Sequence, residues 1–410
     1  MTWTKAHASR RMFGCFAVIW VVLALPLAQG WAGGLYLNEF NTPSAGVAGA
    51  GAQAFAGDAS TAFHNPAGMT HLDGSQLMGG LGLIYGEIEF AGDPTTPIPG
   101  DDGGEAISAP APLLTGFYVH SLSDNLKIGV GLLSISGAAL DYSDGWTGRF
   151  LVQDVQLLTV SAQPVIAYRV NDWLSLGAGV SVMYATLDQD SAVPVPGRPN
   201  GQVSLDGDDT EFGFNLSTLI DLSPRTRFGI SYQSKLALDF SGDVEINPVG
   251  VSAAVDTRLT LPQYIRVGVY HELNDQFALL GTIGWDDWSA LDNLYISTER
   301  LSVQVARNWQ DTYHIAGGIH YRPNDDWLLQ AGIAYDSSPV DKEDRTPDMP
   351  VDRQFRYAVG TQYQWADDLK IGGSLEIVDA GDAEIDRRFL RGDYSKNYLV
   401  YLGLSASWQF

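Results

Sequence analysis

Apolar residues alternate with small or polar residues along most of this chain. Between residues 173 and 186, one parity carries Leu174, Leu176, Ala178, Val180, Val182 and Tyr184, and the other carries Ser175, Gly177, Gly179 and Ser181. Residues 397–410 repeat the pattern. Because successive side chains of a strand point to opposite faces, the alternation predicts β-strands with one apolar face.

Short turn signals divide these strands at a regular spacing. Asx- or Pro-type turns begin at residues 123, 171, 223, 274, 324 and 366, and each is followed at once by alternating residues. Two strands of about 10 residues each leave roughly half of every period for a long connection at the other end. Short turns at one end and long loops at the other are typical of a transmembrane β-barrel.

A kelch-type propeller is an alternative, because its repeat is also about 50 residues long. The inner strands of a propeller are buried on both faces, which does not suit a face made of Gly and Ser. Here one face suits lipid and the other suits an open interior. Counted from Gln76, the chain predicts seven hairpins and therefore an all-β antiparallel barrel of about 14 strands.

Tryptophans also gather at the predicted strand ends. Two interfacial girdles of aromatic residues are typical of membrane barrels. We expect one girdle near the short turns and one near the long loops; the first comprises Trp173, Trp327, Trp365 and Trp408, and the second comprises Trp146, Trp285, Trp288 and Trp309.

The first 32 residues have the layout of a cleavable export signal. Lys5, Arg10 and Arg11 precede an apolar run over residues 12–28, and small residues follow near Ala32. A retained N-terminal anchor is the alternative, although the run is short for a membrane helix. Cleavage would remove Cys15, the only cysteine, so the mature chain would hold no disulfide or thiol site.

The charge balance excludes one class of partner. Without the signal, 21 basic residues face 48 acidic residues, a net charge of −27, which argues against nucleic acid. Apolar residues at 45% argue against disorder. The acidic segments at 205–210 and 341–348 are predicted to be loops. They could bind divalent cations, but a solvated loop is the favoured interpretation, since neither fits the spacing of a calcium loop.

A barrel of this size needs something to close it. Fourteen strands enclose a wider bore than the eight-stranded barrels that side chains fill. Residues 33–75 precede the first strand, and ten of the 13 residues from Ala45 to Gly57 are Ala or Gly. This composition allows close backbone packing. We predict a hatch at 33–75 inside a barrel at 76–410, with a flexible tail as the alternative.

Several longer motifs resemble one known family. They are GGLYLNEF from Gly33, DASTAFHNPAGM from Asp58, WTGRF from Trp146, NDWLSLGAGV from Asn171 and GWDDWS from Gly284. Together they resemble the FadL/TodX family of outer-membrane channels for long-chain fatty acids and other hydrophobic compounds. The resemblance implies a 14-stranded barrel whose N-terminal hatch contains the Asn-Pro-Ala element; here that element is Asn65, Pro66 and Ala67.

The resemblance also implies a transport mechanism. Outer loops capture the substrate, the hatch shifts, and the substrate leaves sideways at a kink in the third strand. In this chain, the apolar parity set from Leu126 to Leu132 changes at Leu133 and Ile135. A change of phase beside glycine suits a bulge or kink. We predict the kink at Ser136, Gly137, Ala138 and Ala139, with a simple strand end as the alternative.

A carboxylate substrate would favour a cation in the lumen. Alternation points Arg258, Arg266 and Arg356 inward, and Arg149 lies in the loop after the third strand. These four arginines are candidate carboxylate-binding residues. The alternative is that they are ordinary lumen cations balanced by acids such as Glu211 and Glu376, and an uncharged hydrocarbon would need none of them.

Catalytic and metal chemistry find little support. The serines and six mature histidines are scattered, with no sign of a nucleophile, base and acid brought together. His64 and His71 lack an accompanying ligand set. His120, His314 and His320 are expected to line the lumen. We therefore predict a channel without enzymatic activity, cofactor or metal; an aqueous porin and an outer-membrane lipid hydrolase are the alternatives.

The predicted partners follow from this interpretation. They are hydrophobic small molecules, outer-membrane lipid and the barrel assembly machinery, because the aromatic terminus Phe410 resembles the assembly signal of bacterial outer-membrane proteins. No nucleic acid is expected, and the protein is expected to be a monomer exported to the bacterial outer membrane.

Overall fold

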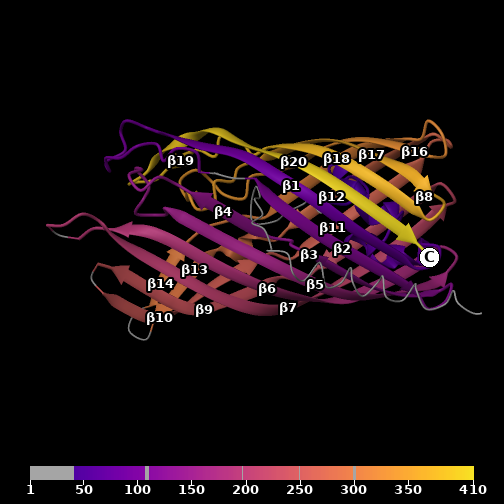
Figure 1. The fold of residues 1–410 in the computed structure, drawn as a ribbon, viewed down its shortest axis with the longest axis horizontal. Helices are drawn as coiled ribbons and strands as arrows, with labels where there is room; N and C mark the ends of the chain where they lie inside the picture. The colour runs from indigo at the N-terminus through magenta and orange to yellow at the C-terminus, as the bar shows by residue number, and fades with distance from the viewer. Residues whose placement is uncertain (1–40, 107–109, 196, 249, 299–301) are drawn as a thin grey trace, which may run out of the picture.

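The computed structural model describes residues 41–106, 110–195, 197–248, 250–298 and 302–410. The predicted signal peptide and residues 33–40 of the predicted hatch lie outside the described residues. The described strands form an elongated barrel with short helical elements within it (Figure 1). In the described part of the chain, no helix reaches the length and hydropathy needed to cross a bilayer.

Fourteen strands close the ring, each antiparallel to both neighbours, which confirms the predicted barrel and its strand number. The ring closes where the first strand pairs with the last, from Gln76 opposite Gln409 to Gly92 opposite Gly392. In order, the strands are β1(Gln76–Gly92), β2(Ala111–Ser121), β3(Leu126–Leu133), β5(Asp154–Asn171), β6(Leu174–Val193), β7(Gly201–Ser223), β8(Thr226–Gln233), β11(Tyr264–Glu272), β12(Phe277–Asp286), β15(Thr312–Tyr321), β16(Trp327–Asp336), β17(Gln354–Ala366), β18(Leu369–Asp379) and β20(Arg391–Gln409).

Six further strands extend the wall at the long-loop end. There β9 pairs with β7, β10 with β9, β13 with β10 and β14 with β13, so part of the wall continues beyond the ring (Figure 1). The remaining two, β4 and β19, pair with β5 and β20. The six are β4(Gly137–Asp141), β9(Leu236–Asn247), β10(Val251–Leu261), β13(Asn293–Thr298), β14(Ser302–Ala306) and β19(Ile385–Asp386).

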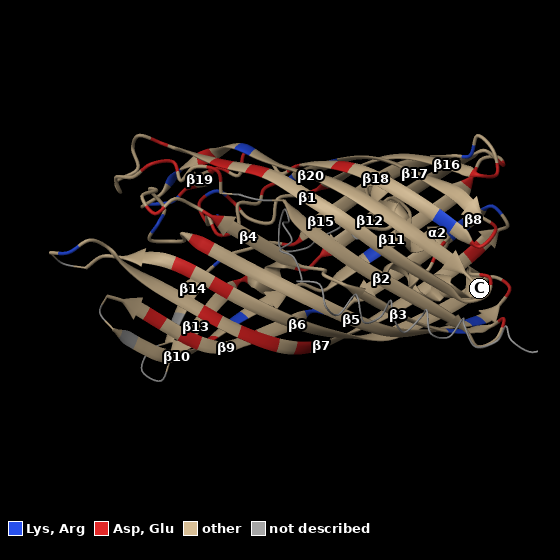
Figure 2. Ribbon diagram, in the orientation of Figure 1, with Lys and Arg blue, Asp and Glu red and all other residues tan. Residues whose placement is uncertain are grey.

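The acidic residues gather on this extension and on the nearby loops (Figure 2). Residues 205–210, which the sequence suggests to be a loop, instead belong to β7, and Asp206 and Asp208 point outward and are exposed. The loop prediction is wrong because the hairpin of β6 and β7 runs far past the apolar band. In that region an outward side chain meets solvent, so a strand can carry aspartates.

The outer face of the ring is apolar, as predicted. Phe212, Leu404 and Trp365 are among its exposed residues, at 63%, 64% and 65% of their possible surface. The four tryptophans near the short turns are all exposed on this face. A band that is apolar all around the ring suits lipid.

The tryptophans expected near the long loops do not form a girdle. Trp146 is fully buried, stacks on Tyr142 at 4.1 Å, and donates its indole N–H to the carbonyl of Val152 at 2.7 Å. Trp288, in the helical turn η3(Trp288–Leu291), packs against Trp309 inside the barrel. The prediction fails for these three because their loops fold inward. Exposed aromatic residues on the strands lie at that end instead, namely Tyr85, Tyr184, Tyr313 and Tyr357.

The inner face has two zones. Toward the short turns it carries the small and polar residues that the alternation predicts. Toward the long loops much of it is apolar, which the sequence interpretation did not predict. There the buried side chains form one large cluster, which we call the apolar cluster; its members include Phe63, Ile84, Phe117, Ile135, Leu157, Leu238, Phe240 and Tyr401.

Residues 41–75 pack against the inner wall of the ring. They form four short helical elements, η1(Pro43–Val47), α2(Ala52–Phe55), α3(Thr61–His64) and η2(Pro66–His71). We call residues 41–75 the inner segment. Its η1 contacts β16 to β18, α2 contacts β8 and β11, and η2 contacts β5 to β7. The segment ends at Ser75, which exchanges two backbone hydrogen bonds with Phe410 (3.0 and 2.9 Å) and so joins the first strand to the end of the last.

Glycines in the strands make room for the inner segment. A Cβ atom built at Gly229 would lie 1.7 Å from the carbonyl oxygen of Gln53, and one at Gly177 would lie 2.4 Å from the amide of Ala67. At Gly332 it would lie 2.2 Å from the carbonyl oxygen of Val47. The wall therefore meets the backbone of the inner segment directly, and any side chain at these positions would separate them.

We expect Gly332→Val to push η1 away from the wall. Valine is favourable in a strand, so any loss of stability should come from the clash between its side chain and the backbone of Val47. Hydrogen exchange of residues 43–55 should become faster. Gly317→Val is the matched control, because a Cβ there meets nothing within 4 Å. Equal exchange in both variants would contradict the proposed fit.

Candidate functional site

A small cavity lies between the inner segment and the wall. The inner segment contributes Gln53, Phe63 and His64 to its lining, and the wall contributes several polar residues together with Ile135; these wall residues include Asn215, Gln233, Arg266, Thr282 and His314. Its volume is about 70 Å³. A cavity of roughly 150 Å³ is needed to hold a molecule such as benzene. The conformation described here has room for a polar head group or water, but not for an apolar chain.

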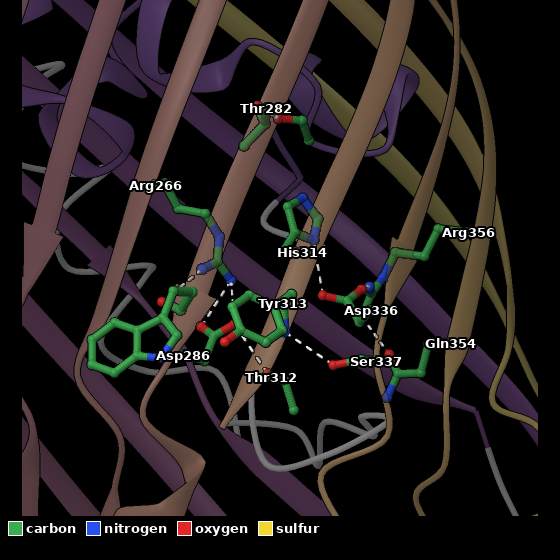
Figure 3. Close-up of polar contacts among 12 residues, drawn as sticks. Arg266, Thr282, Asp286, Thr312, Tyr313, His314, Asp336, Ser337, Gln354 and Arg356 are labelled. Carbon is green, nitrogen blue, oxygen red and sulfur yellow. Dashed lines mark hydrogen bonds and ion pairs between the residues drawn. The ribbon is translucent and has the colours of Figure 1, made fainter. Parts of the chain in front are cut away.

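Charged side chains form a belt along one side of the lumen (Figure 3). Arg266 on β11 binds both carboxylate oxygens of Asp286 on β12 (2.9 and 3.1 Å). His314 on β15 bonds through Nδ1 to Asp336 on β16 (2.8 Å). The other carboxylate oxygen of Asp336 accepts from Arg356 on β17. On consecutive strands of the ring, arginine or histidine residues therefore alternate with aspartates.

Two of the candidate arginines belong to this belt, and their charges are already compensated. The side chain of Arg356 is 3% exposed; it also contacts Glu376 (3.6 Å) and Gln354 (2.6 Å). That of Arg266 is 11% exposed. A buried ion pair costs desolvation that only close partners offset. A substrate carboxylate could take either arginine only by displacing a protein carboxylate.

The other two candidate arginines lie elsewhere. Arg149 is half-buried in a turn, where its guanidinium donates to the carbonyls of Pro99 (2.9 Å) and Trp146 (2.7 Å). Arg258 does not point inward, contrary to the expectation from alternation. It is exposed and paired with Asp239, while Leu259 is buried.

The reversal at Arg258 has a physical reason. This residue lies on β10, in the part of the wall that extends past the ring. The inner face there belongs to the apolar cluster, so the leucines of β10 turn inward and the arginine turns to solvent. The rule that the apolar parity faces outward holds only within the lipid-facing band.

The Asn-Pro-Ala element ties the inner segment together and to the wall. The side-chain amide of Asn65 donates to the carbonyls of Gln53 (2.6 Å) and Thr218 (3.0 Å), and its oxygen accepts from the backbone of Ala67 (3.1 Å). Pro66 begins η2, where a missing N–H has no cost. The amide of Ala67 also donates to the hydroxyl of Ser217 (3.0 Å). These contacts join parts of the protein to one another, which indicates a structural role for the element.

The two histidines near this element have other partners than a metal. His64 bonds through Nε2 to the hydroxyl of Ser44 (3.1 Å), and His71 bonds to Asp221 (3.0 Å). Within the described ranges, no three His, Cys, Asp or Glu side chains gather so that they could hold a metal ion.

The third strand is interrupted at the predicted kink. β3 ends at Leu133, and β4 begins at Gly137, with Ser136 between them and Ala138 and Ala139 following in β4. Both β3 and β4 pair with β5. On the other side, β2 pairs with β3 only from Gly116 onward, and the described residues of β4 have no ladder with β2. The wall therefore has a gap in its hydrogen-bond ladder between β2 and β4.

Loop residues close the long-loop end. The connection between β16 and β17 folds inward, and Val340 and Val351 join the apolar cluster. Asp348 in this connection is buried against Arg307. Burial raises the pKa of Asp348, but the Arg307 guanidinium outweighs this effect and holds the pKa below its ordinary value. The ion pair therefore persists at neutral pH, although the sequence suggested a solvated loop.

Sequence reasoning missed a set of buried amides on the inner face. Asn215 and Gln233 line the cavity, and Gln163 lies on β5. Each has a side-chain nitrogen without a partner among the described residues. These amides alternate with the apolar residues of their strands, so the sequence pattern predicts that they lie on the inner face. The absence of partners could be found only from the assembled structure.

Comparisons with known proteins agree with the family resemblance of the sequence motifs. The sequence profile of a family described as outer membrane protein transport protein (OMPP1/FadL/TodX) matches residues 23–401. The chain is 26% identical over 412 residues to the long-chain fatty acid transport protein of Escherichia coli O157:H7, covering 89% of this chain and 92% of that protein. It is 26% identical over 398 residues to outer membrane protein P1 of Haemophilus influenzae, covering 85% and 86%.

Solved structures share the fold. A FadL homologue of Pseudomonas aeruginosa matches with a TM-score of 0.84 at 23% identity, over 92% of this chain and 100% of that one. The toluene transporter TbuX of Ralstonia pickettii matches with a TM-score of 0.72 at 18% identity, over 90% and 97%.

We expect Arg356→Leu to destabilise the barrel strongly. The change removes the guanidinium that Asp336 and Glu376 share, and removal of one partner from a buried ion pair typically costs about 3–5 kcal/mol. Arg225→Leu is the control, because its partner Asp275 is 94% exposed and such pairs contribute about 1 kcal/mol or less. Denaturant unfolding in detergent micelles would measure both. Equal losses would show that the belt is not a buried ionic network.

Proposed function

Since the chain belongs to the OMPP1/FadL/TodX family of outer membrane transport proteins, we propose that it is an outer-membrane channel for the uptake of long-chain fatty acids or related hydrophobic molecules. The curated relatives named for long-chain fatty acid transport and the shared fold of toluene transporters support this substrate class. These relatives are transport proteins, which is consistent with a chain that is not an enzyme.

The apolar cluster carries the proposal. It lines the inner face at the long-loop end and reaches the cavity through Phe63 and Ile135. Each methylene group of a substrate gains about 0.8 kcal/mol on leaving water for such a surface. A general aqueous porin would need a polar lumen here, because sugars and salts gain nothing from apolar walls.

The inner segment is the proposed hatch. Its backbone lies directly on the wall glycines, and Asn65 holds two of its parts together. The cavity of about 70 Å³ is too small for an apolar chain. Passage therefore requires the inner segment or the inward-folded loops to shift. We also propose that residues 33–40 belong to the hatch and that residues 1–32 are a cleaved signal peptide.

The ladder gap beside β4 is the proposed lateral exit. Ala138 and Leu140 of β4 lie opposite the inward residues Leu157 and Val155 of β5, and Ile135 lines the cavity just before β4. A hydrophobic molecule that leaves sideways stays out of water, which an axial route would not allow. We further propose that the protein acts as a monomer that the barrel assembly machinery inserts.

Uptake measurements test the function itself. Vesicles that contain the protein should take up labelled long-chain fatty acid faster than empty vesicles, with no matching rise in sugar permeation. The reason is that the apolar cluster favours the chain and the inner segment obstructs water. Sugar flux without fatty-acid uptake would favour the porin alternative and overturn the proposal.

Gly137→Ile tests the exit. A bulky β-branched side chain at the start of β4 should narrow the gap and slow fatty-acid uptake several-fold while the barrel stays folded. Gly317→Ile is the control, since its side chain points into open space. Uptake equal in both variants would remove the lateral exit, even if transport itself is established.

A further inference from the structure

Two amides stand opposite each other beside the cavity. Asn215 on β7 and Gln233 on β8 are directly paired across the strands, so their side chains share the inner face. They are 4% and 3% exposed. Neither the nitrogen nor the oxygen of the Asn215 amide has a partner among the described residues, and the nitrogen of Gln233 has none either.

Buried amides without partners are costly. Leaving such a group unsatisfied costs about 1–3 kcal/mol, so native proteins rarely keep one. Two amides together, both lining one cavity, point to a molecule that supplies the missing hydrogen bonds. Water is one candidate, and the head group of a substrate is the other.

Four other polar side chains of the cavity already have hydrogen-bond partners. Arg266 binds Asp286, and His314 binds Asp336. The hydroxyl of Ser231 donates to the carbonyl of His64 (2.6 Å), and that of Thr282 accepts from the backbone of Gly51 (2.8 Å). The amide pair differs from these four groups, because it offers both donors and an acceptor to a new molecule.

Another part of the cavity lining suits an apolar chain. Phe63 and Ile135 line it and belong to the apolar cluster, which continues toward the long-loop end. The volume of about 70 Å³ corresponds to roughly two water molecules, at about 30 Å³ each. A carboxyl or hydroxyl group fits this space, while its chain would extend along the apolar cluster once the hatch or loops yield.

We propose that Asn215 and Gln233 form a binding site for the uncharged, hydrogen-bonding head group of a long-chain amphiphile, a protonated carboxyl group or a hydroxyl group. This rests on the proposed function as a channel for hydrophobic molecules. The head group is uncharged because the nearby cations are neutralised and an additional buried anion would lack a counter-charge. The arginines, on this proposal, shape the lumen and leave recognition to the amides.

The experiment compares the binding of two ligands to the wild type and to one double variant. A long-chain fatty alcohol and an alkane of equal chain length are titrated onto the full-length protein in detergent micelles. The double variant Asn215→Leu/Gln233→Met should bind the alcohol about tenfold more weakly and the alkane equally well or better, because only the alcohol uses the hydrogen bonds. For each ligand, comparison of the variant with the wild type cancels the partition into micelles, which is the same for both proteins.

Gln163→Met is the matched control. Gln163 is also a buried inner-face glutamine, 2% exposed, with an unpartnered nitrogen, but it does not line the cavity. Its variant should keep the preference for alcohol over alkane. Retention of the heat-modifiable migration of folded barrels on gels would confirm that both variants fold.

Two results would overturn the proposal. If the double variant loses alcohol and alkane binding equally, the amides only support the fold. If it loses neither, water satisfies them. Both outcomes concern binding to purified protein, so they are distinct from a failure of fatty-acid uptake in vesicles, which would overturn the proposed function instead.

Discussion

The structure depends on one constraint: inside a membrane, each backbone N–H and C=O must find a partner within the protein. The ring of 14 strands satisfies it by pairing β1 with β20 and thereby removing both sheet edges. Where the ladder breaks at the third strand, a side chain forms hydrogen bonds with the backbone instead. The hydroxyl of Thr159 donates to the carbonyl of Ser136 and accepts from its amide (3.3 Å). These two bonds satisfy the backbone of Ser136, which lies beside the gap.

The same logic governs the lumen, where polar side chains replace water. The charged belt is internally compensated, because Arg266 and Arg356 each pair with an aspartate on an adjacent strand. Such a belt adds little net charge to the interior. The outward face of the extension carries the excess acids, away from the path of a hydrophobic molecule (Figure 2).

The sequence predicts the ring well and the interior poorly. Alternation is a local property, so Leu176 or Phe212 reveals its lipid-facing side without knowledge of the partner strand. The orientation of Arg258 depends on where the lipid-facing band ends, which no local pattern marks. Trp146 is buried because its loop folds back, and Arg266 meets Asp286 only through the register of β11 and β12. The Asn65 motif was recognised from resemblance, whereas its contacts with Gln53 and Thr218 required the fold.

The pair of hydrogen bonds between Ser75 and Phe410 couples the interior of the barrel to its closure. The residue that ends the inner segment is bonded to Phe410, at the seam where β1 meets β20. A displacement of the inner segment that reaches Ser75 would therefore strain the seam, whereas a displacement of η1 or α2 alone would leave it intact.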